Sequence, residues 1–398
     1  MKNDIVAVAG WIVGIPHPKP VTILRTMTPV RGFAILLVVM AHAVIMMLAA
    51  ENIRAPGTSL TPELWGIWQL ASPVKSIVLE LCACAVPIFL FLSGFYTIAA
   101  PQSWKAIWSS CRKLLLPMIT WSLLAWAISW RKGAGWSIMK FLGLLLSGKT
   151  QTGYFFIVLI IQFYILSRWL VPAMKKHASR ILFFAILLQL ATHLYDYVYL
   201  LAQLGIIPQI WLIAKIGPFP EFLFPRFMVA FTLGVWASQA NQPFRNIIQD
   251  QFPVVLFATT LAAAILVFER GLLFRHAFVV LERSEFEATA ISWVGWKLGT
   301  ALWTISAIFL VLGWFQKRIP IRSLLDKLGK YSFQIFLLHG MILDFVRSIV
   351  YKYFHSMKFY GWAGCLVLLA AGIAGPIILT AAIQKWMPAR LRVFMLGS

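Results

Sequence analysis

Residues 30–50 read VRGFAILLVVMAHAVIMMLAA, and this stretch decides the fold. Apart from Arg31 and His42, it is apolar over about 20 residues, which is enough for a helix to cross the hydrocarbon core of a bilayer. In hydrocarbon, backbone amides form their hydrogen bonds either within a helix or between the strands of a closed β-barrel. The strands of a barrel alternate apolar and polar residues, and this stretch does not. Similar stretches recur, and the sequence predicts ten membrane helices, at about 30–50, 74–98, 114–130, 153–171, 180–202, 221–238, 252–268, 299–315, 332–351 and 360–384. We therefore expect an all-α polytopic membrane protein.

The composition favours the same class. Of 398 residues, 61% are hydrophobic and 12% are charged, whereas soluble domains have about 45–50% and about 25%. A soluble fold could not bury so much apolar surface, which excludes a soluble enzyme, a nucleic-acid-binding module and a disordered scaffold. The four cysteines show neither a CxxC pair nor a spacing with histidine that suits zinc, so we predict neither disulfides nor a metal site.

The net charge of +22 bears first on topology, because lysine and arginine favour cytoplasmic loops. An even number of crossings puts both termini on one side. The loops on that side hold more basic residues than the loops opposite, although loop 131–149 runs against this bias. We expect both termini in the cytoplasm. The predicted organisation is a cytoplasmic or interfacial segment at 1–29, a ten-helix domain at 30–385 and a short basic tail at 386–398.

Ionisable groups inside a membrane need a reason, because each costs about 2.5–3.5 kcal/mol at a helix centre. His42 follows Arg31 by eleven residues, so it lies about 16 Å deeper, near the midplane, and on the same helix face. A neutral imidazole there suits a general base, and the alternative is a hydrogen bond to a neighbouring helix. His339 lies about 12 Å into a later helix by the same rise, which brings it within reach of His42. A purely structural hydrogen bond is the leading alternative for His339.

A second group of ionisable residues falls in the outer half of the membrane. His193 and Asp196 are spaced i, i+3 and share a helix face. Side chains of this group either form ion pairs that fix helix packing or line a wet cavity for a polar substrate. The candidate substrate-binding residues are Glu80, His193, Asp196, Arg226, His339 and Asp344.

The inner half carries small and basic residues. Pro87 interrupts the helical hydrogen bonds, and Ser93-Gly94 permits close approach of a backbone or a ligand. Basic groups at the inner mouth of the helices suit phosphates, and they equally suit topology and lipid headgroups. These groups are Arg112 and Lys113 at one helix start, and Arg318 and Arg322 in another loop.

Several of these residues belong to short motifs that occur in a particular order. The motifs are RGF at 31–33 with ten residues between Arg31 and His42, FLFLSGF at 89–95, RKLLLP at 112–117, GYFF at 153–156, RFMVAFTLG at 226–234 and YSFQIFLLH at 331–339. In this order, spread over about 25–385, they resemble the membrane acyltransferase-3 family. Many members carry a second arginine before the third-helix proline, where this chain has Leu115.

The resemblance implies transfer of an acyl group, most often acetyl from acetyl-CoA, to a hydroxyl of a carbohydrate or lipid-linked glycan. It places the donor at the cytoplasmic face. In this interpretation His42 takes the proton of the acceptor hydroxyl or relays the acyl group as a covalent intermediate, and Arg31 orients His42 or binds a donor phosphate. The residues expected to hold acyl-CoA are Ser93, Gly94, Arg112, Tyr154, Arg318 and Arg322.

The expected partners are acyl-CoA, the glycan acceptor and membrane lipids, without nucleic acid or metal; pairing with a second copy or with glycan-assembly proteins stays open. The expected location is the bacterial cytoplasmic membrane. The alternative function is a flippase or transporter of a polyisoprenyl-linked sugar that uses the same cavity without acyl chemistry. Such transporters usually carry internal repeats, and none is visible here. A purely structural assembly partner is disfavoured by the cost of the buried ionisable groups.

Overall fold

The computed structural model describes residues 24–54, 74–75, 77–98, 102–131, 137–208, 215, 217–282, 297–317, 319–353 and 362–397. Within these residues the chain is helical and has no strand, which confirms the predicted all-α class. The elements are α2 (Leu24–Arg54), η1 (Cys82–Cys84), α4 (Ala85–Thr97), α5 (Trp104–Arg131), α6 (Ile138–Leu146), α7 (Phe155–Gln203), η2 (Phe224–Phe227), α9 (Met228–Gln239), α10 (Asn241–Gln249), α11 (Phe252–Arg275), η3 (His276–Val280), α13 (Leu298–Trp314), α14 (Arg322–Lys330), α15 (Ser332–Tyr353), α16 (Trp362–Trp386) and α17 (Ala389–Leu396).

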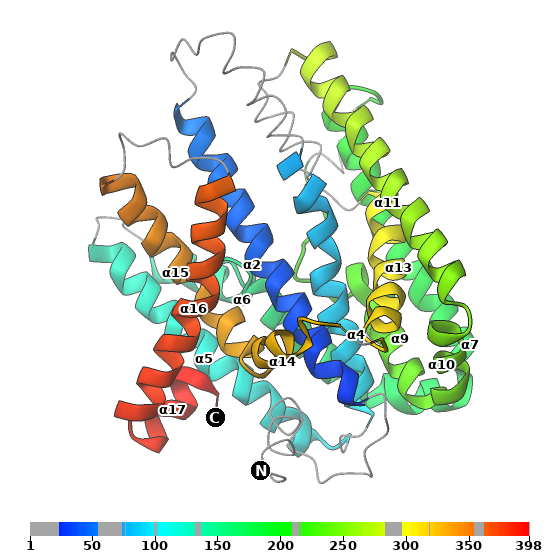
Figure 1. Cartoon of the computed structure of the whole chain (residues 1–398), viewed down its shortest axis with the longest axis horizontal. Coiled ribbons are helices and arrows are strands. Elements are labelled where there is room, and N and C mark those ends of the chain that lie inside the picture. The colour runs from blue at the N-terminus through cyan, green and yellow to red at the C-terminus, as the bar shows by residue number, and fades with distance from the viewer. Residues whose placement is uncertain are drawn as a thin grey trace.

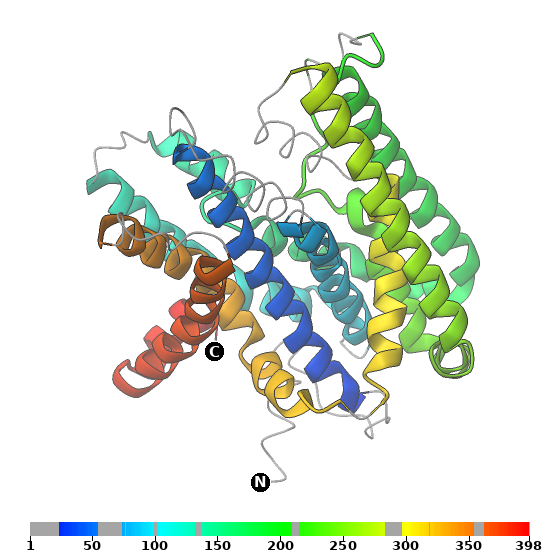
Figure 2. The ribbon, with the colours of Figure 1, turned by 45° about the horizontal axis from the view of Figure 1, so that its top comes forward.

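Helix α2 runs through the middle of the molecule (Figure 1). On one side lie α5, α15, α16 and α17, and on the other lie α7, α9, α11 and α13. Figure 2 shows the same division after a turn of 45°. Helix α2 packs against α4, α14, α15 and α16, so residues along it contact helices that are distant in sequence. The start of α2 lies at the same end of the bundle as α10, α14 and α17 (Figure 1).

Seven segments in the described part of the chain are long and apolar enough to cross a membrane. Three features account for the difference from the predicted ten. The predicted spans 153–171 and 180–202 both fall in α7, whose 49 residues are interrupted by a non-helical backbone at His177. Helix α9 has 12 residues and α13 has 17, so both fall below the length of the other spans. The side on which the termini lie stays a prediction, and residues 1–23 of the expected N-terminal segment lie outside the described residues.

Helix ends follow from local sequence. Pro87 lies in the first turn of α4, directly after the 3-10 turn η1, where its missing N–H removes no helical hydrogen bond. Helix α5 begins at Trp104, ten residues before the predicted 114, because its polar first turns remain helical beyond the apolar part. The short helix α6 is capped by Ser137, which accepts a hydrogen bond of 3.2 Å from the backbone N–H of Lys140.

Helices α4 and α9 cross closely through two glycines. Gly94 of α4 lies directly against the carbonyl of Phe231, and Gly234 of α9 lies directly against the carbonyl of Phe91. A Cβ at either position would overlap the opposite backbone. Between membrane helices, where lipid is as apolar as leucine, such close packing supplies much of the attraction.

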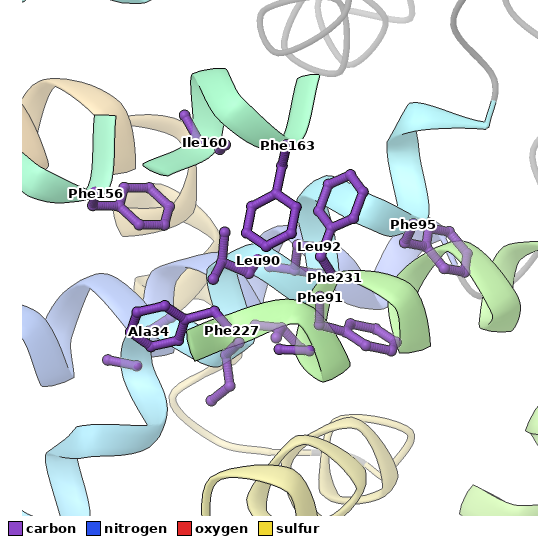
Figure 3. Close-up of a cluster of buried hydrophobic side chains, with 14 of the residues drawn as sticks. Ala34, Leu90, Phe91, Leu92, Phe95, Phe156, Ile160, Phe163, Phe227 and Phe231 are labelled. Carbon is purple, nitrogen blue, oxygen red and sulfur yellow. The ribbon is translucent and has the colours of Figure 1, made fainter. Parts of the chain in front are cut away.

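Aromatic side chains fill the space around this crossing (Figure 3). Phe163 of α7 stacks on Phe231 of α9, with ring centroids 4.4 Å apart and planes inclined by 15°. Phe91 of α4 stacks on Phe244 of α10, with centroids 5.7 Å apart. These contacts hold α4, α7, α9 and α10 in one packed unit, beside which the cavity described below is formed.

Candidate active site

Two histidines meet in the interior, one from α2 and one from α15. Nε2 of His339 lies 2.9 Å from Nδ1 of His42, and the rings are inclined by 29° with centroids 4.9 Å apart. His339 is completely buried and His42 is partly buried. The two imidazoles form one hydrogen-bonded pair, and among the described residues His42 has no other hydrogen-bond partner.

Backbone carbonyls determine which nitrogen of a neutral His339 carries the hydrogen. Its Nδ1 lies 3.0 Å from the oxygen of Ile335 and 2.7 Å from the oxygen of Phe336. Carbonyl oxygens only accept, so Nδ1 is the donor and Nε2 must accept. The partner atom, Nδ1 of His42, therefore donates, which leaves Nε2 of His42 with a lone pair that can take a proton.

The turn before α7 borders this histidine pair. Gly153 has a positive φ of +89°, which glycine adopts without the strain that other residues meet. A Cβ added there would lie 3.7 Å from Cε1 of both His42 and His339, so the bare backbone passes beside both rings. The buried hydroxyl of Tyr154 donates a hydrogen bond of 2.8 Å to the oxygen of Leu337. Tyr154, expected at the donor site, instead joins this turn to α15.

A cavity opens next to the pair, bounded by residues from α2, α4, α5, α7, α14, α15 and α17. Its polar lining consists of Arg31, Ser93, Ser110, Lys113, Tyr164, Lys330, Ser332 and Gln334. Its apolar lining consists of Phe89, Leu114, Phe156, Ile157, Ile160, Phe333, Phe336 and Leu396. Neither histidine lines the cavity. Phe336 connects the two, because it lines the cavity and its ring centroid lies 5.9 Å from that of His339.

The polar and apolar residues separate along the helices. On α2, Arg31 precedes His42 by about 16 Å of helical rise, and on α15 Ser332 precedes His339 by about 10 Å. On α7, Phe156 lies near the histidines, while Tyr164 lies about 12 Å farther along. The cavity therefore has a cationic end away from the histidines and an aromatic end beside them.

Arg31 is the buried cation of the polar end. It is 7% exposed, and its Nε has no hydrogen-bond partner among the described residues. The described groups that act on it electrostatically are the hydroxyls of Tyr96 and Tyr164, with no carboxylate among them. Oε1 of Gln334, 4% exposed, is also without a described partner. Buried polar atoms left in this way favour a ligand that satisfies them, and an anion suits the guanidinium.

The other residues expected at the donor site are distributed unequally. Ser93 lines the cavity, whereas its neighbour Gly94 contacts α9 and not the cavity. Arg112 is exposed on α5, and the adjacent Lys113 lines the cavity in its place. Arg322 starts α14 away from the lining, and Arg318 lies outside the described residues.

The residues expected to bind the acceptor form separate clusters. Asp196 of α7 pairs with Arg226 of η2, and its Oδ1 accepts a hydrogen bond of 2.8 Å from the backbone N–H of Phe219. The neighbouring His193 contacts Gln189, with 3.3 Å between the two Nε2 atoms. Oε1 of Gln189 accepts a hydrogen bond of 2.9 Å from the backbone N–H of Val229 in α9.

Glu80 belongs to a second buried cluster. Its Oε1 lies 2.5 Å from Nζ of Lys297 and 3.7 Å from a guanidinium nitrogen of Arg270. Asp344, by contrast, is about half exposed and pairs with Arg347 on the same helix at 3.3 Å. Ion pairing is thus the observed arrangement of Glu80, Asp196, Arg226 and Asp344. Of the six candidate substrate-binding residues, His339 is the one that lies beside His42.

Six residues of the site were not among the predicted site residues: Gly153, Phe89, Phe156, Phe336, Lys330 and Gln334. All except Lys330 lie within the quoted motifs, but those motifs assigned them no role. For Phe336 the spacing gave a further signal, because Ser332, Phe336 and His339 are spaced i, i+4, i+7 and share a helix face. The positive φ of Gly153 and the approach of Phe89 and Phe156 depend on tertiary packing, which the pattern of a single helix does not contain.

Apolar helices around an interior histidine pair, with a cationic cavity beside it, are the arrangement of a multi-pass membrane protein. Comparison with known families identifies it further. The model of the acyltransferase-3 family, described as an acyltransferase domain, matches residues 29–381. The chain belongs to this family and is a membrane acyltransferase. No curated protein and no solved structure shows a significant match.

Proposed function

We propose that the chain transfers an acyl group, with acetyl as the first candidate, from acyl-CoA to a hydroxyl of a carbohydrate or lipid-linked glycan in the bacterial cytoplasmic membrane. The observation that supports this proposal is the position of the His42–His339 pair beside the aromatic end of a cavity whose far end is cationic. Acyl-CoA has the same polarity, with anionic phosphates at one end and an acyl thioester at the other.

The cationic end suits the donor phosphates. Arg31 is buried without a described carboxylate partner, and Lys113 and Lys330 line the same cavity nearer to solvent. Guanidinium and ammonium groups bind phosphate oxygens through charge-assisted hydrogen bonds, and the buried Arg31 gains most because it has little water to lose. The expected role of Arg31 in phosphate binding agrees with this position.

The histidine pair suits the acyl transfer. Nε2 of His42 takes the proton of the acceptor hydroxyl while the hydroxyl oxygen attacks the thioester carbonyl. The carbon–sulfur bond breaks, and the same proton passes from His42 to the thiolate, so ester and free CoA are the products. In the alternative route the same lone pair of His42 attacks the thioester carbonyl and the carbon–sulfur bond breaks, which leaves the acyl group on Nε2 and releases CoA as thiolate. The acceptor oxygen then takes the acyl group from Nε2, and the hydroxyl proton goes to the CoA thiolate, so the products are the same. In both routes Nε2 of His339 accepts the Nδ1 hydrogen of His42 and stabilises its positive charge.

The proposal is tested by feeding isotope-labelled acetyl-CoA to the purified protein in nanodiscs, together with glycan fractions from its host membranes. We expect label in an O-acyl group of one fraction and release of an equal amount of free CoA. The same modification should disappear from cells that lack the gene. An unchanged acylation profile in every fraction would contradict the proposal, and sugar counterflow without CoA release would support transport instead.

A further inference from the structure

Three phenylalanines form a continuous row from the cavity to the histidine pair. Ring centroids of Phe89 and Phe156 are 5.9 Å apart, and those of Phe156 and Phe336 are 5.3 Å apart. The row ends at His339, 5.9 Å from Phe336. The three rings come from α4, α7 and α15, and all three line the cavity.

On two of these three helices a polar side chain lies one turn from the row, toward the cationic end of the cavity. On α4, Ser93 lies one turn beyond Phe89 toward the cationic end, and on α15 Ser332 lies one turn before Phe336. The part of a ligand that passes the rings therefore meets apolar surface, which excludes a phosphate or a sugar and suits an acyl chain.

Two rings of the row are also largely buried. Phe336 is 6% exposed and Phe156 is 9% exposed, and both contact neighbouring rings. Protein interiors are close-packed and do not accept extra methylene groups without moving side chains. A chain longer than the available space must displace a ring, whereas a short chain need not.

We infer that Phe89, Phe156 and Phe336 set the acyl-chain length of the donor, and that they restrict it to acetyl or a similarly short group. This inference rests on the proposed function, because it assigns the cavity to acyl-CoA. Phe336 is the decisive ring, since it lines the cavity and its centroid lies 5.9 Å from that of His339 at the end of the row. Pockets of this kind discriminate by about 10- to 200-fold for each methylene that does not fit.

The test measures binding of CoA, acetyl-CoA, butyryl-CoA and hexanoyl-CoA to the purified full chain in nanodiscs. We expect the wild type to bind acetyl-CoA at least about 10-fold more tightly than hexanoyl-CoA. Phe336→Ala should reduce or reverse this ratio by about 10-fold or more, with the affinity for CoA itself unchanged. Phe336→Leu, a milder change, should shift the ratio in the same direction and covers the case in which the alanine variant does not fold.

Phe345→Ala is the matched control, because Phe345 lies on the same helix, is 66% exposed and does not line the cavity. It should leave the ratio of acetyl-CoA to hexanoyl-CoA affinity unchanged. If the wild type binds every chain length equally, or if the ratio is the same in the wild type and in folded Phe336 variants, the length filter is wrong while the proposed function stands. If the wild type binds neither CoA nor any acyl-CoA, both proposals fail.

Discussion

Replacement of His42 by alanine should abolish acyl transfer, with a loss of at least about 10²–10⁴-fold in kcat/KM. The reason is that Nε2 of His42 carries the lone pair that the hydrogen bond to His339 leaves available. The rate of CoA release from acetyl-CoA, in the presence of the glycan fraction that accepts label, measures this loss. Expression and thermal stability should stay close to those of the wild type, because His42 contributes one side-chain hydrogen bond and is partly exposed.

His177→Ala provides the control for this substitution. His177 is exposed at the interruption of α7 and lies outside the cavity. The control should retain full activity. A folded His42→Ala protein with wild-type turnover would remove His42 from the mechanism and leave the function of the pair unexplained.

Substitution of His339 should give the second largest loss, about 10²-fold in kcat for His339→Leu, because leucine offers no acceptor to Nδ1 of His42. His42 would then be free to rotate and to expose either nitrogen. In the proposed mechanism His339 is a positioning residue, so the KM for acyl-CoA should change little. Steady-state kinetics with varied acyl-CoA separate the two parameters.

Rescue distinguishes positioning from a merely structural role. His339→Gln keeps a carbonyl oxygen that can accept from His42, and it should recover part of the lost kcat. Leucine and glutamine variants of equal thermal stability but different turnover would support the tautomer argument. Equal turnover in the two variants would show that the acceptor at residue 339 has no part in catalysis.

The sequence was informative wherever a single helix carried the signal. Arg31 and His42 share one face of α2 by spacing alone, and the structure places Arg31 in the cavity and His42 in the histidine pair. The approach of His339 to His42 also followed from depth, because both helices were assumed to start from the same side.

Contacts between helices were less predictable. Ser93 and Gly94 are adjacent, yet one lines the cavity and the other packs on α9, because successive helical residues point about 100° apart. Which of the two residues faces the cavity depends on where α9 packs against α4, and the sequence of α4 does not contain that position. The same holds for Arg112 and Lys113, of which only the second lines the cavity.

The number of spans was limited by helix length rather than by hydropathy. The predicted spans 153–171 and 180–202 lie on the two sides of the break at His177, so the hydropathy pattern placed this interruption between them. Helices α9 and α13 are apolar but short, and hydropathy alone does not report how many residues a helix will contain.

In the proposed mechanism the acyl end of acyl-CoA reaches the histidine pair through the aromatic end of the cavity. Photocross-linking can locate that end, with a short acyl-CoA that carries a photoreactive diazirine and with mass spectrometry to map the adducts on the wild-type protein. We expect adducts on the peptide that contains Phe336 and His339 and on the start of α7 near Phe156, all suppressed by excess acetyl-CoA. Adducts confined to other helices, or insensitive to acetyl-CoA, would contradict this mechanism.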